Sequence, residues 1–345
     1  MSVSATITQS SGGASRRAED GAVADMERIA GLIQRAKTAI EQVIYGQGLV
    51  VEECLITILA GGHVLLIGVP GLAKTKLVQT LGTVLGLNDK RVQFTPDLMP
   101  ADIIGSEVLE EGADGKRFFR FIQGPVFCQL LMADEINRAS PRTQSALLQS
   151  MQEHHVSVAG HQHPLPHPFH VLATQNPVEQ EGTYPLPEAQ LDRFLMQVDI
   201  HYPDFEAERQ IILRTTGADQ AVAQQVLSSD DLVAAQNLVR QVPVGESVVN
   251  AILKLVRSGR PETTDLQEVK DRVAWGPGPR ASQALMQATR ARALLQGRLS
   301  PSVDDVLALA RPVLQHRMAL NFGARADGHT LSALIDLLCQ RIDAG

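Results

Sequence analysis

The sequence has few aromatic residues. Of 345 residues only 13 are aromatic, namely 9 Phe, 3 Tyr and 1 Trp. The protein must therefore pack mainly Leu, Ile, Val and Ala, which favours helices and parallel strands over an aromatic-rich β-sandwich. Because 44% of the residues are hydrophobic, the chain can still bury substantial cores, and its length suggests about two domains.

Cysteines and long apolar runs are also scarce. Cys54, Cys128 and Cys339 are too few and too far apart for a disulfide framework. No apolar run approaches the roughly 20 residues of a membrane span. The first 22 residues contain no apolar segment of the signal-peptide type. We therefore expect a cytoplasmic protein without a membrane span.

The chain lacks an excess of positive charge as well. Its 31 Lys and Arg residues stand against 38 Asp and Glu residues, a formal charge of −7. Proteins that bind nucleic acids non-specifically usually present a basic face. We therefore expect no nucleic-acid partner.

Apolar patterning divides the chain into three parts. Residues 1–22, rich in Ser, Gly, Ala and Thr without periodicity, are predicted to be a disordered tail. Residues 23–203 are predicted to be a doubly wound α/β core with a parallel sheet, and residues 204–345, which show only helical periodicity, an all-α domain. The core contains apolar runs typical of strands buried on both faces, at 63–68, 91–94, 129–133, 169–174 and 195–200. The helices of the second domain are predicted at 205–216, 229–241, 247–258, 282–296, 303–311 and 330–342.

The first of these strands leads directly into a glycine-rich loop and then a helical pattern. A triphosphate needs backbone N–H groups, a helix N-terminus, a lysine for its β- and γ-oxygens and a hydroxyl on Mg²⁺, and this segment supplies all four. We predict that it binds ATP and that Thr75 is a ligand of Mg²⁺. The predicted nucleotide-binding residues are Gly68, Val69, Pro70, Gly71, Leu72, Ala73, Lys74, Thr75 and Lys76.

One position departs from the general phosphate-loop pattern G-x-x-x-x-G-K-[ST]. The residue before Lys74 is Ala73 instead of glycine. If this residue has a helical φ, its methyl group costs little, whereas a positive φ would strain the loop. The sequence leaves both possibilities open.

Two adjacent carboxylates, Asp134 and Glu135, end the third apolar run. At the carboxyl edge of a sheet, Asp134 can orient the Mg²⁺ shell while Glu135 activates a water molecule against the γ-phosphate. The alternative is a solvated acidic turn, and the phosphate loop upstream argues against it.

These motifs resemble those of AAA+ ATPases, and the loop with its alanine resembles the MoxR family in particular. The resemblance extends from about Met26 to the C-terminus and implies a core with a five-stranded parallel sheet and a C-terminal helical lid. It gives catalytic roles, besides that of Glu135, to three residues. Asn176, before Pro177, would be sensor 1 near the γ-phosphate. Arg193 would be the arginine finger for a neighbouring subunit, and Arg280 would be sensor 2, which joins the lid to the phosphates.

Each of these three residues also has a simpler interpretation. Asn176 can belong to an Asn-Pro turn, and Arg193 can form a local ion pair with Asp192. Arg280 can be an ordinary exposed arginine. It falls in the first turn of a predicted helix, where a cation opposes the helix dipole and therefore calls for an anionic neighbour.

The resemblance also implies an assembly. Relatives of the MoxR family are chaperone-like ATPases that form rings, so we expect a homo-oligomer, a hexamer, that binds Mg-ATP between subunits and remodels a protein client. A partner with a von Willebrand factor A domain is implied too. Three alternatives remain: a small-molecule phosphotransferase, a nucleic-acid motor of the same clade, and a nucleotide-gated scaffold.

Two segments extend the chain beyond a minimal ATPase. Residues 99–127 show a strand pattern on both sides of Gly112 and Gly115, which predicts a hairpin resembling the helix-2 insert of this clade. Residues 154–168 resemble the hairpin that precedes sensor 1. Many histidines lie in and just after the second segment, but nearby prolines make a zinc site with rigid geometry less favoured than a solvated hairpin.

Overall fold

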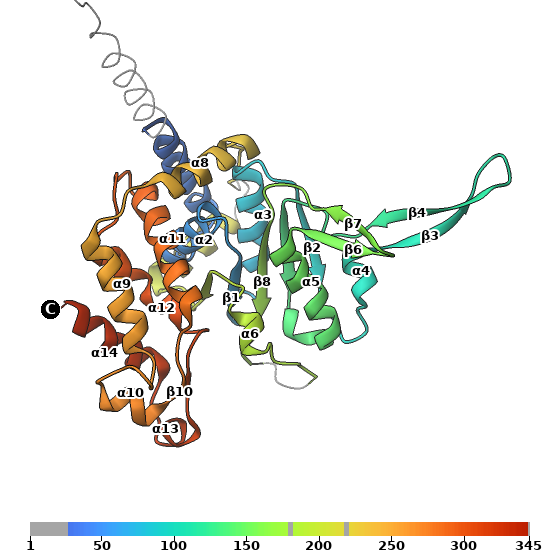
Figure 1. Cartoon of the computed structure of the whole chain (residues 1–345). Helices are drawn as coiled ribbons and strands as arrows, with labels where there is room; N and C mark the ends of the chain where they lie inside the picture. Colours follow the sequence, from blue (N-terminus) through green and yellow to red (C-terminus); the bar gives the residue numbers. More distant parts are fainter. Residues whose placement is uncertain (1–26, 179–181, 217–220, 344–345) are drawn as a thin grey trace, which may run out of the picture.

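The computed structural model describes residues 27–178, 182–216 and 221–343. Its centre is a five-stranded sheet in the order β2-β5-β8-β1-β9 (Figure 1). Neighbouring strands of this sheet all pair in parallel. The predicted strands are confirmed with small shifts at their ends, as β1 (Val64–Ile67), β2 (Asp89–Gln93), β5 (Leu130–Asp134), β8 (His170–Gln175) and β9 (Met196–Asp199).

Successive side chains of each strand enter two different cores. In β1, Val64 and Leu66 belong to the core on one face of the sheet, and Leu65 belongs to the core on the other face. This is the period of two expected of a strand that is covered on both sides. The first face is covered by a helix at 27–41, α2 (Gly48–Leu59) and α3 (Lys74–Val84), and the second by α4 (Pro100–Ile104) and α5 (Pro141–Glu153).

The C-terminal part of the chain is helical, as predicted, and shares the core of α2 and α3. Its antiparallel pair of strands, β10 with β11, was not predicted. Strands of two or three residues are too short to show a period in the sequence. The elements after β9 are α7 (Phe205–Thr215), α8 (Ser229–Gln241), α9 (Glu246–Ser258), α10 (Gln267–Arg272), β10 (Val273–Trp275), α11 (Pro279–Leu295), α12 (Val303–Leu314), β11 (Ala319–Leu320), α13 (Phe322–Ala326) and α14 (Leu331–Asp343).

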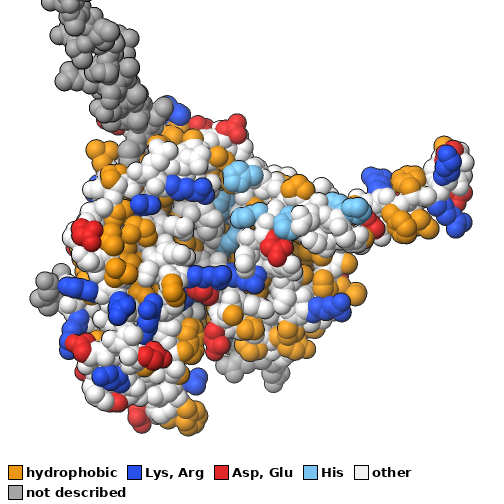
Figure 2. Space-filling view, in the orientation of Figure 1, with side chains coloured by type: hydrophobic (Ala, Val, Ile, Leu, Met, Phe, Trp, Pro, Cys, Tyr) orange, Lys and Arg blue, Asp and Glu red, His pale blue; other side chains and the backbone are white. Residues whose placement is uncertain are grey.

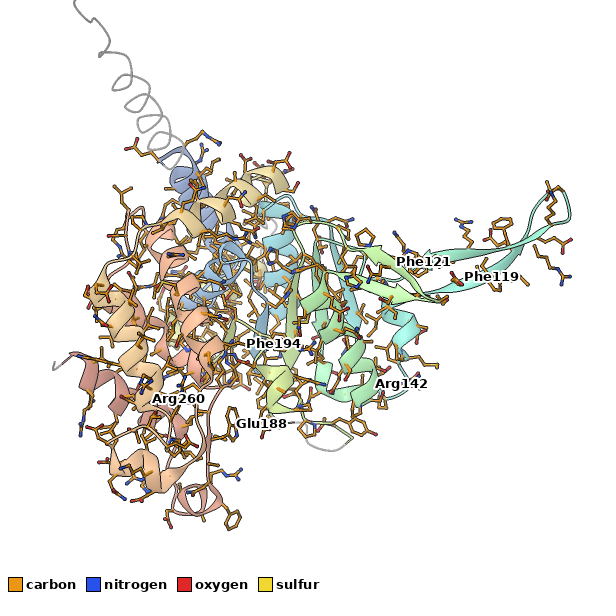
Figure 3. The ribbon with its side chains drawn as sticks, in the orientation of Figure 1. Phe119, Phe121, Arg142, Glu188, Phe194 and Arg260 are labelled. Carbon is orange, nitrogen blue, oxygen red and sulfur yellow. The ribbon has the colours of Figure 1, made fainter. Side chains whose placement is uncertain are left out.

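Both predicted hairpins are present. The longer one, β3 (Gly105–Glu111) with β4 (Arg117–Gln123), projects away from the core in Figure 1. Phe121 near its base stacks on His163, with ring centroids 3.8 Å apart. Farther out, Phe119 is 69% exposed (Figure 3). Apolar and charged side chains alternate along this hairpin in Figure 2. The second hairpin consists of β6 (His155–Val158) and β7 (His161–Pro164).

Some predictions concern the ends and environment of the chain. The predicted disordered tail, residues 1–22, lies outside the described residues, and the domain boundary at residue 203 stays a prediction. Among the described helices, none has the length and apolar character needed to span a bilayer. All three cysteines are free thiols, and Cys54 and Cys128 are buried.

Candidate active site

The glycine-rich loop turns the chain from β1 into α3. Gly68 packs closely on Ile200, where a Cβ atom would lie 3.0 Å from the Cβ and the carbonyl oxygen of that residue. Gly71 has a φ of +86°, which glycine adopts without strain. Lys74 begins α3, and its ammonium donates to the Gly68 carbonyl at 2.5 Å. The lysine and the first N–H groups of α3 therefore meet at the end of the loop, an arrangement that binds phosphate.

Ala73 has the strained conformation of the two that the sequence allowed. Its φ of 55° and ψ of 21° are left-handed, so the alternative of a helical φ is wrong. A left-handed residue with a Cβ atom costs about 1–2 kcal/mol. The Ala73 carbonyl accepts the Leu77 N–H at 2.9 Å, so this conformation starts α3.

Asp134 ends β5 and is only 8% exposed. Its Oδ2 accepts a hydrogen bond from Nη2 of Arg91 at 2.6 Å, and its Oδ1 accepts one from the hydroxyl of Thr174, also at 2.6 Å. Neither partner was predicted. Arg91 lies on β2 and Thr174 on β8, the strands on either side of β5, so only the strand order brings them to this carboxylate.

Glu135 follows with a left-handed backbone of its own, at a φ of 55°. Its N–H donates to Oγ1 of Thr174 at 2.8 Å. Its carboxylate accepts hydrogen bonds from Gln93 at 2.8 Å and from Arg138 at 2.9 Å, in the 3-10 turn η1 (Ile136–Arg138). Both bonds end on Oε2 and orient the carboxylate. Within the part of the chain that the structure describes, Oε1 is left as the oxygen that can take a proton from a water molecule.

Asn176 follows β8 and is 5% exposed, with its Oδ1 accepting the Val178 N–H at 3.1 Å. Because β8 lies between β5 and β1, Asn176 lies between the two carboxylates and the glycine-rich loop. The structure thus brings these predicted residues to the carboxyl edge of the sheet. We call this set the P-loop edge, and it comprises residues 68–76, Asp134, Glu135 and Asn176.

A cleft of about 120 Å³ adjoins the loop. Tyr45, Leu72 and Ile211 contribute to its walls. Gln47, also in the wall, donates from Nε2 to the Leu72 carbonyl at 3.1 Å, whereas its buried Oε1 has no partner within the described residues. A largely apolar cleft next to a phosphate loop fits a purine ring.

Arg193 and Arg280 lie elsewhere. Both line a cleft of about 280 Å³ together with Gly61, Gly62 and His63, which precede β1. The glycine-rich loop follows β1, so the two arginines lie at the opposite, amino edge of the sheet. At about 3.3 Å per residue, the strand separates the two sites by about 16 Å. The structure therefore does not bring Arg280 to the phosphate loop of its own chain.

We call this second site the arginine cleft. Three arginines, Arg193, Arg280 and Arg317, are among the described residues that line it, together with a single acidic residue, Asp192. Burial lowers the pKa of the lining residue His63 to about 3, so this imidazole is neutral at pH 7. The cleft therefore carries a net positive charge and suits an anion.

The individual arginines differ in their contacts. Arg280 lies in the first turn of α11, and its Nη1 is 3.5 Å from Oδ2 of Asp192, which is the anionic neighbour that its helix position called for. Arg193 donates from Nη1 to the Leu148 carbonyl near the end of α5. The Nε of Arg193 is buried and has no partner among the described residues.

Comparison with known proteins identifies the family of the chain. The profile described as "ATPase family associated with various cellular activities (AAA)" matches residues 63–196, and that of the "AAA lid domain" matches residues 266–336. Over 311 residues the chain is 43% identical to Chaperone MoxR1 of Mycobacterium tuberculosis, covering 90% of this chain and 81% of that relative. The chain belongs to the MoxR family of AAA+ ATPases.

Other members are similar over comparable lengths. Protein MoxR of Paracoccus denitrificans is 32% identical over 303 residues, which cover 83% of this chain and 88% of that one. The crystal structure of a protein from Cytophaga hutchinsonii, assigned as an ATPase, has 37% identity and a TM-score of 0.86, with 95% of this chain and 98% of that chain covered. As a MoxR-family member the protein is an ATPase with an α/β core and a helical lid.

Proposed function

We propose that this MoxR-family ATPase hydrolyses Mg-ATP at the interfaces between subunits of a ring, a hexamer, and uses the hydrolysis to remodel a protein client. One observation carries the proposal: the P-loop edge and the arginine cleft lie on opposite edges of one sheet. A single chain cannot apply its arginines to its own nucleotide. A second copy, with its arginine cleft against the P-loop edge of the first, completes the site.

The donor atoms of the P-loop edge fit Mg-ATP. A threonine hydroxyl from Thr75 and a carboxylate from Asp134 are the hard oxygen ligands that Mg²⁺ prefers, directly or through water. Lys74 would bind the β- and γ-phosphates, and the cleft lined by Tyr45, Leu72 and Ile211 would hold the adenine ring. Magnesium, when bound, neutralises charge on the phosphates of the nucleotide.

Hydrolysis then needs a proton acceptor and charge stabilisation. Glu135, oriented through its Oε2, accepts a proton from the attacking water on Oε1. Asn176 lies where it can orient that water. Arg193 and Arg280 of the neighbouring subunit would stabilise the charge that develops on the γ-phosphate, a contribution of about 10³ to 10⁵ in rate for an arginine finger.

The proposal of a protein client rests on two supports. A relative with 43% identity carries the name Chaperone MoxR1. In addition, the β3–β4 hairpin exposes large apolar side chains, including Leu109, Phe118 and Phe119, and exposed apolar side chains of this kind can contact proteins. A partner with a von Willebrand factor A domain and a cytoplasmic location belong to the same proposal.

Mixing two inactive variants tests the shared site. Lys74→Ala removes the phosphate lysine but keeps the arginine cleft, whereas Arg193→Ala keeps the P-loop edge but removes the finger. Each protein alone should be nearly inactive. After subunit exchange, interfaces that pair an intact P-loop edge with an intact Arg193 should restore ATPase activity in proportion to their number.

The control is energy transfer between labelled subunits, which reports exchange independently of activity. If exchange occurs and activity does not return, Arg193 acts within its own chain and the shared site is wrong. If turnover per chain of the wild type stays constant when the protein is diluted until it is monomeric, the ring is not needed for activity. The alternative of a monomeric phosphotransferase is then favoured.

A further inference from the structure

The lid holds the core segment that carries Arg193. Residues 315–317, which follow α12, donate hydrogen bonds to residues 192–197. Among them, Nε2 of His316 donates to the Phe194 carbonyl at 3.0 Å. Figure 3 places Phe194 where the core meets the lid, and Lys and Arg side chains gather near this junction in Figure 2. The position of Arg193 is therefore tied to the lid and not only to the sheet.

Arg317 is the centre of this contact. It is 3% exposed, and its Nε donates to Oδ1 of Asp192 at 2.7 Å. A guanidinium has five N–H groups, and the other four have acceptors as well. These acceptors are the carbonyl oxygens of Asp192, Val313, Phe194 and Leu195, at 2.6 to 3.3 Å.

Asp192 joins this buried arginine to an accessible one. Its Oδ1 accepts from Arg317, and its Oδ2 lies 3.5 Å from Nη1 of Arg280, whose side chain is 51% exposed. Asp192 is also the direct chain neighbour of Arg193. The Asp192 carboxylate thus contacts Arg280 of the lid, which lines the cleft, and Asp192 directly precedes Arg193 in the chain.

We propose that Asp192 and Arg317 are positioning residues for the shared ATP site, and this rests on the function proposed above. They make the lid and the Arg193 segment one unit, and they hold Arg280 beside that segment. The two arginines then approach the phosphates of the neighbouring subunit together. The pair acts in the subunit that donates the arginines and not in the subunit that holds the nucleotide.

The contact geometry favours this role over a general one in folding. If the pair served only to attach the lid, the carbonyl acceptors of Arg317 would suffice, and Asp192 would need no second arginine. Instead Oδ2 faces Arg280, whose side chain is 51% exposed and also lines the cleft. Displacing a reacting group by about 1 Å can cost about 100-fold in rate. A carboxylate that fixes the positions of Arg193 and Arg280 can therefore have a large effect on the rate of hydrolysis.

Mixed assemblies can place one substitution in either subunit. The reference mixture is Lys74→Ala with Arg193→Ala, as above. In the first test, Asp192→Asn is added to the Lys74→Ala chain, which donates the arginines, and the restored activity should fall by about tenfold or more. In the second, Asp192→Asn is added to the Arg193→Ala chain, which only holds the nucleotide, and the restored activity should stay within about twofold of the reference.

A matched control removes another ion pair of the lid. Arg311 and Asp336 form one at 2.7 Å, with both side chains about half exposed. Asp336→Asn in the Lys74→Ala chain should leave the restored activity unchanged. Arg317→Lys, which keeps the charge but not the five donors, should act like Asp192→Asn when placed in the donating chain, provided that its circular dichroism spectrum is that of a folded protein.

The outcomes separate the two proposals. Equal loss of activity in both placements of Asp192→Asn would show a structural role and overturn the inference. No loss in the donating chain would overturn it too. If the reference mixture itself regains no activity, the shared site is wrong, and that result is read before any Asp192 variant is added.

Discussion

The P-loop edge and the arginine cleft differ in how their residues come together. At the P-loop edge the side chains follow the ends of neighbouring parallel strands, so the sheet alone places them. In the arginine cleft, Asp192 meets Arg280 across 88 residues and Arg317 across 125 residues of sequence. The first site is therefore complete within the core, whereas the second exists only while the core and the lid are docked.

This difference suggests how nucleotide binding and subunit contact are coupled. A rotation of the lid would leave the P-loop edge intact but would move Arg280 and, through residues 315–317, strain the segment that carries Arg193. The geometry of the arginine cleft thus depends on the orientation of the lid. The variants below should affect either binding or turnover, depending on the edge that they alter.

Glu135→Gln should have the largest effect. Turnover should fall at least about 100-fold, because the general base is lost, while Mg-ATP binds with near-normal affinity through Lys74 and the loop. Steady-state hydrolysis and binding of a fluorescent ATP analogue measure the two quantities. A comparable loss of binding would instead make Glu135 a structural residue or a metal ligand.

Arg280→Ala should have the next largest effect. This residue lies in the arginine cleft, at the edge of the sheet opposite to Glu135. Turnover of the assembled protein should fall about tenfold or more, while the affinity for ATP stays within about twofold because Arg280 lies at the far edge from its own phosphate loop. Arg290, on the same helix α11, provides a control variant, Arg290→Ala, outside the residues that line the cleft. A marked loss of ATP affinity in Arg280→Ala would place this arginine on its own nucleotide.

The two edges also differ in how far the sequence predicted them. The glycine-rich loop and Asp134 were predicted because each follows a buried apolar run, and the carboxyl ends of parallel strands share one edge. The role of Asn176 was instead implied by the family resemblance. Their partners Arg91 and Thr174 were missed, since pairing across strands requires the strand order. The unit of Asp192, Arg280 and Arg317 was missed for a similar reason: nothing local to any of these residues indicates the docking of the lid.

The same reasoning applies to the short elements of the lid. The longer helices were predicted with bounds close to those of the structure: α8 has the predicted bounds, whereas α11 begins three residues earlier and α12 ends three residues later than predicted. The strands β10 and β11 have three and two residues, and their pairing joins the segment before α11 to the segment after α12. Only tertiary contact defines elements of this length.

Stability should fall in mild acid because of histidines buried near the arginine cleft. Burial lowers the pKa of His63 to about 3 and that of His170 to about 4, so both stay neutral in the folded protein. Below pH 6.5 the unfolded chain takes up these protons and the folded chain does not. Stability that is complete above pH 6.5 is therefore lost as the pH falls, by about 2 kcal/mol per histidine at pH 5.

Urea unfolding of His170→Asn at several pH values measures this term. The variant should lose about 2 kcal/mol less than the wild type between pH 6.5 and pH 5, whatever its stability at neutral pH. His161→Asn, at an exposed position of β7, should show the wild-type pH dependence. Identical pH dependence in all three proteins would mean that His170 is accessible to protons in the folded state.

Ala73→Gly should have the smallest effect and should be confined to the P-loop edge. Alanine at a φ of 55° is strained, and glycine adopts this conformation freely, so the free energy of unfolding should rise by about 0.5–1 kcal/mol. ATP affinity should stay within about threefold, because the loop keeps its shape and the arginine cleft is untouched. Ala73→Val, with a β-branched side chain that tolerates a positive φ poorly, should lower both quantities. If glycine destabilises the protein instead, the methyl group of Ala73 makes a contact that outweighs its backbone strain, and the left-handed alanine is a stabilising choice.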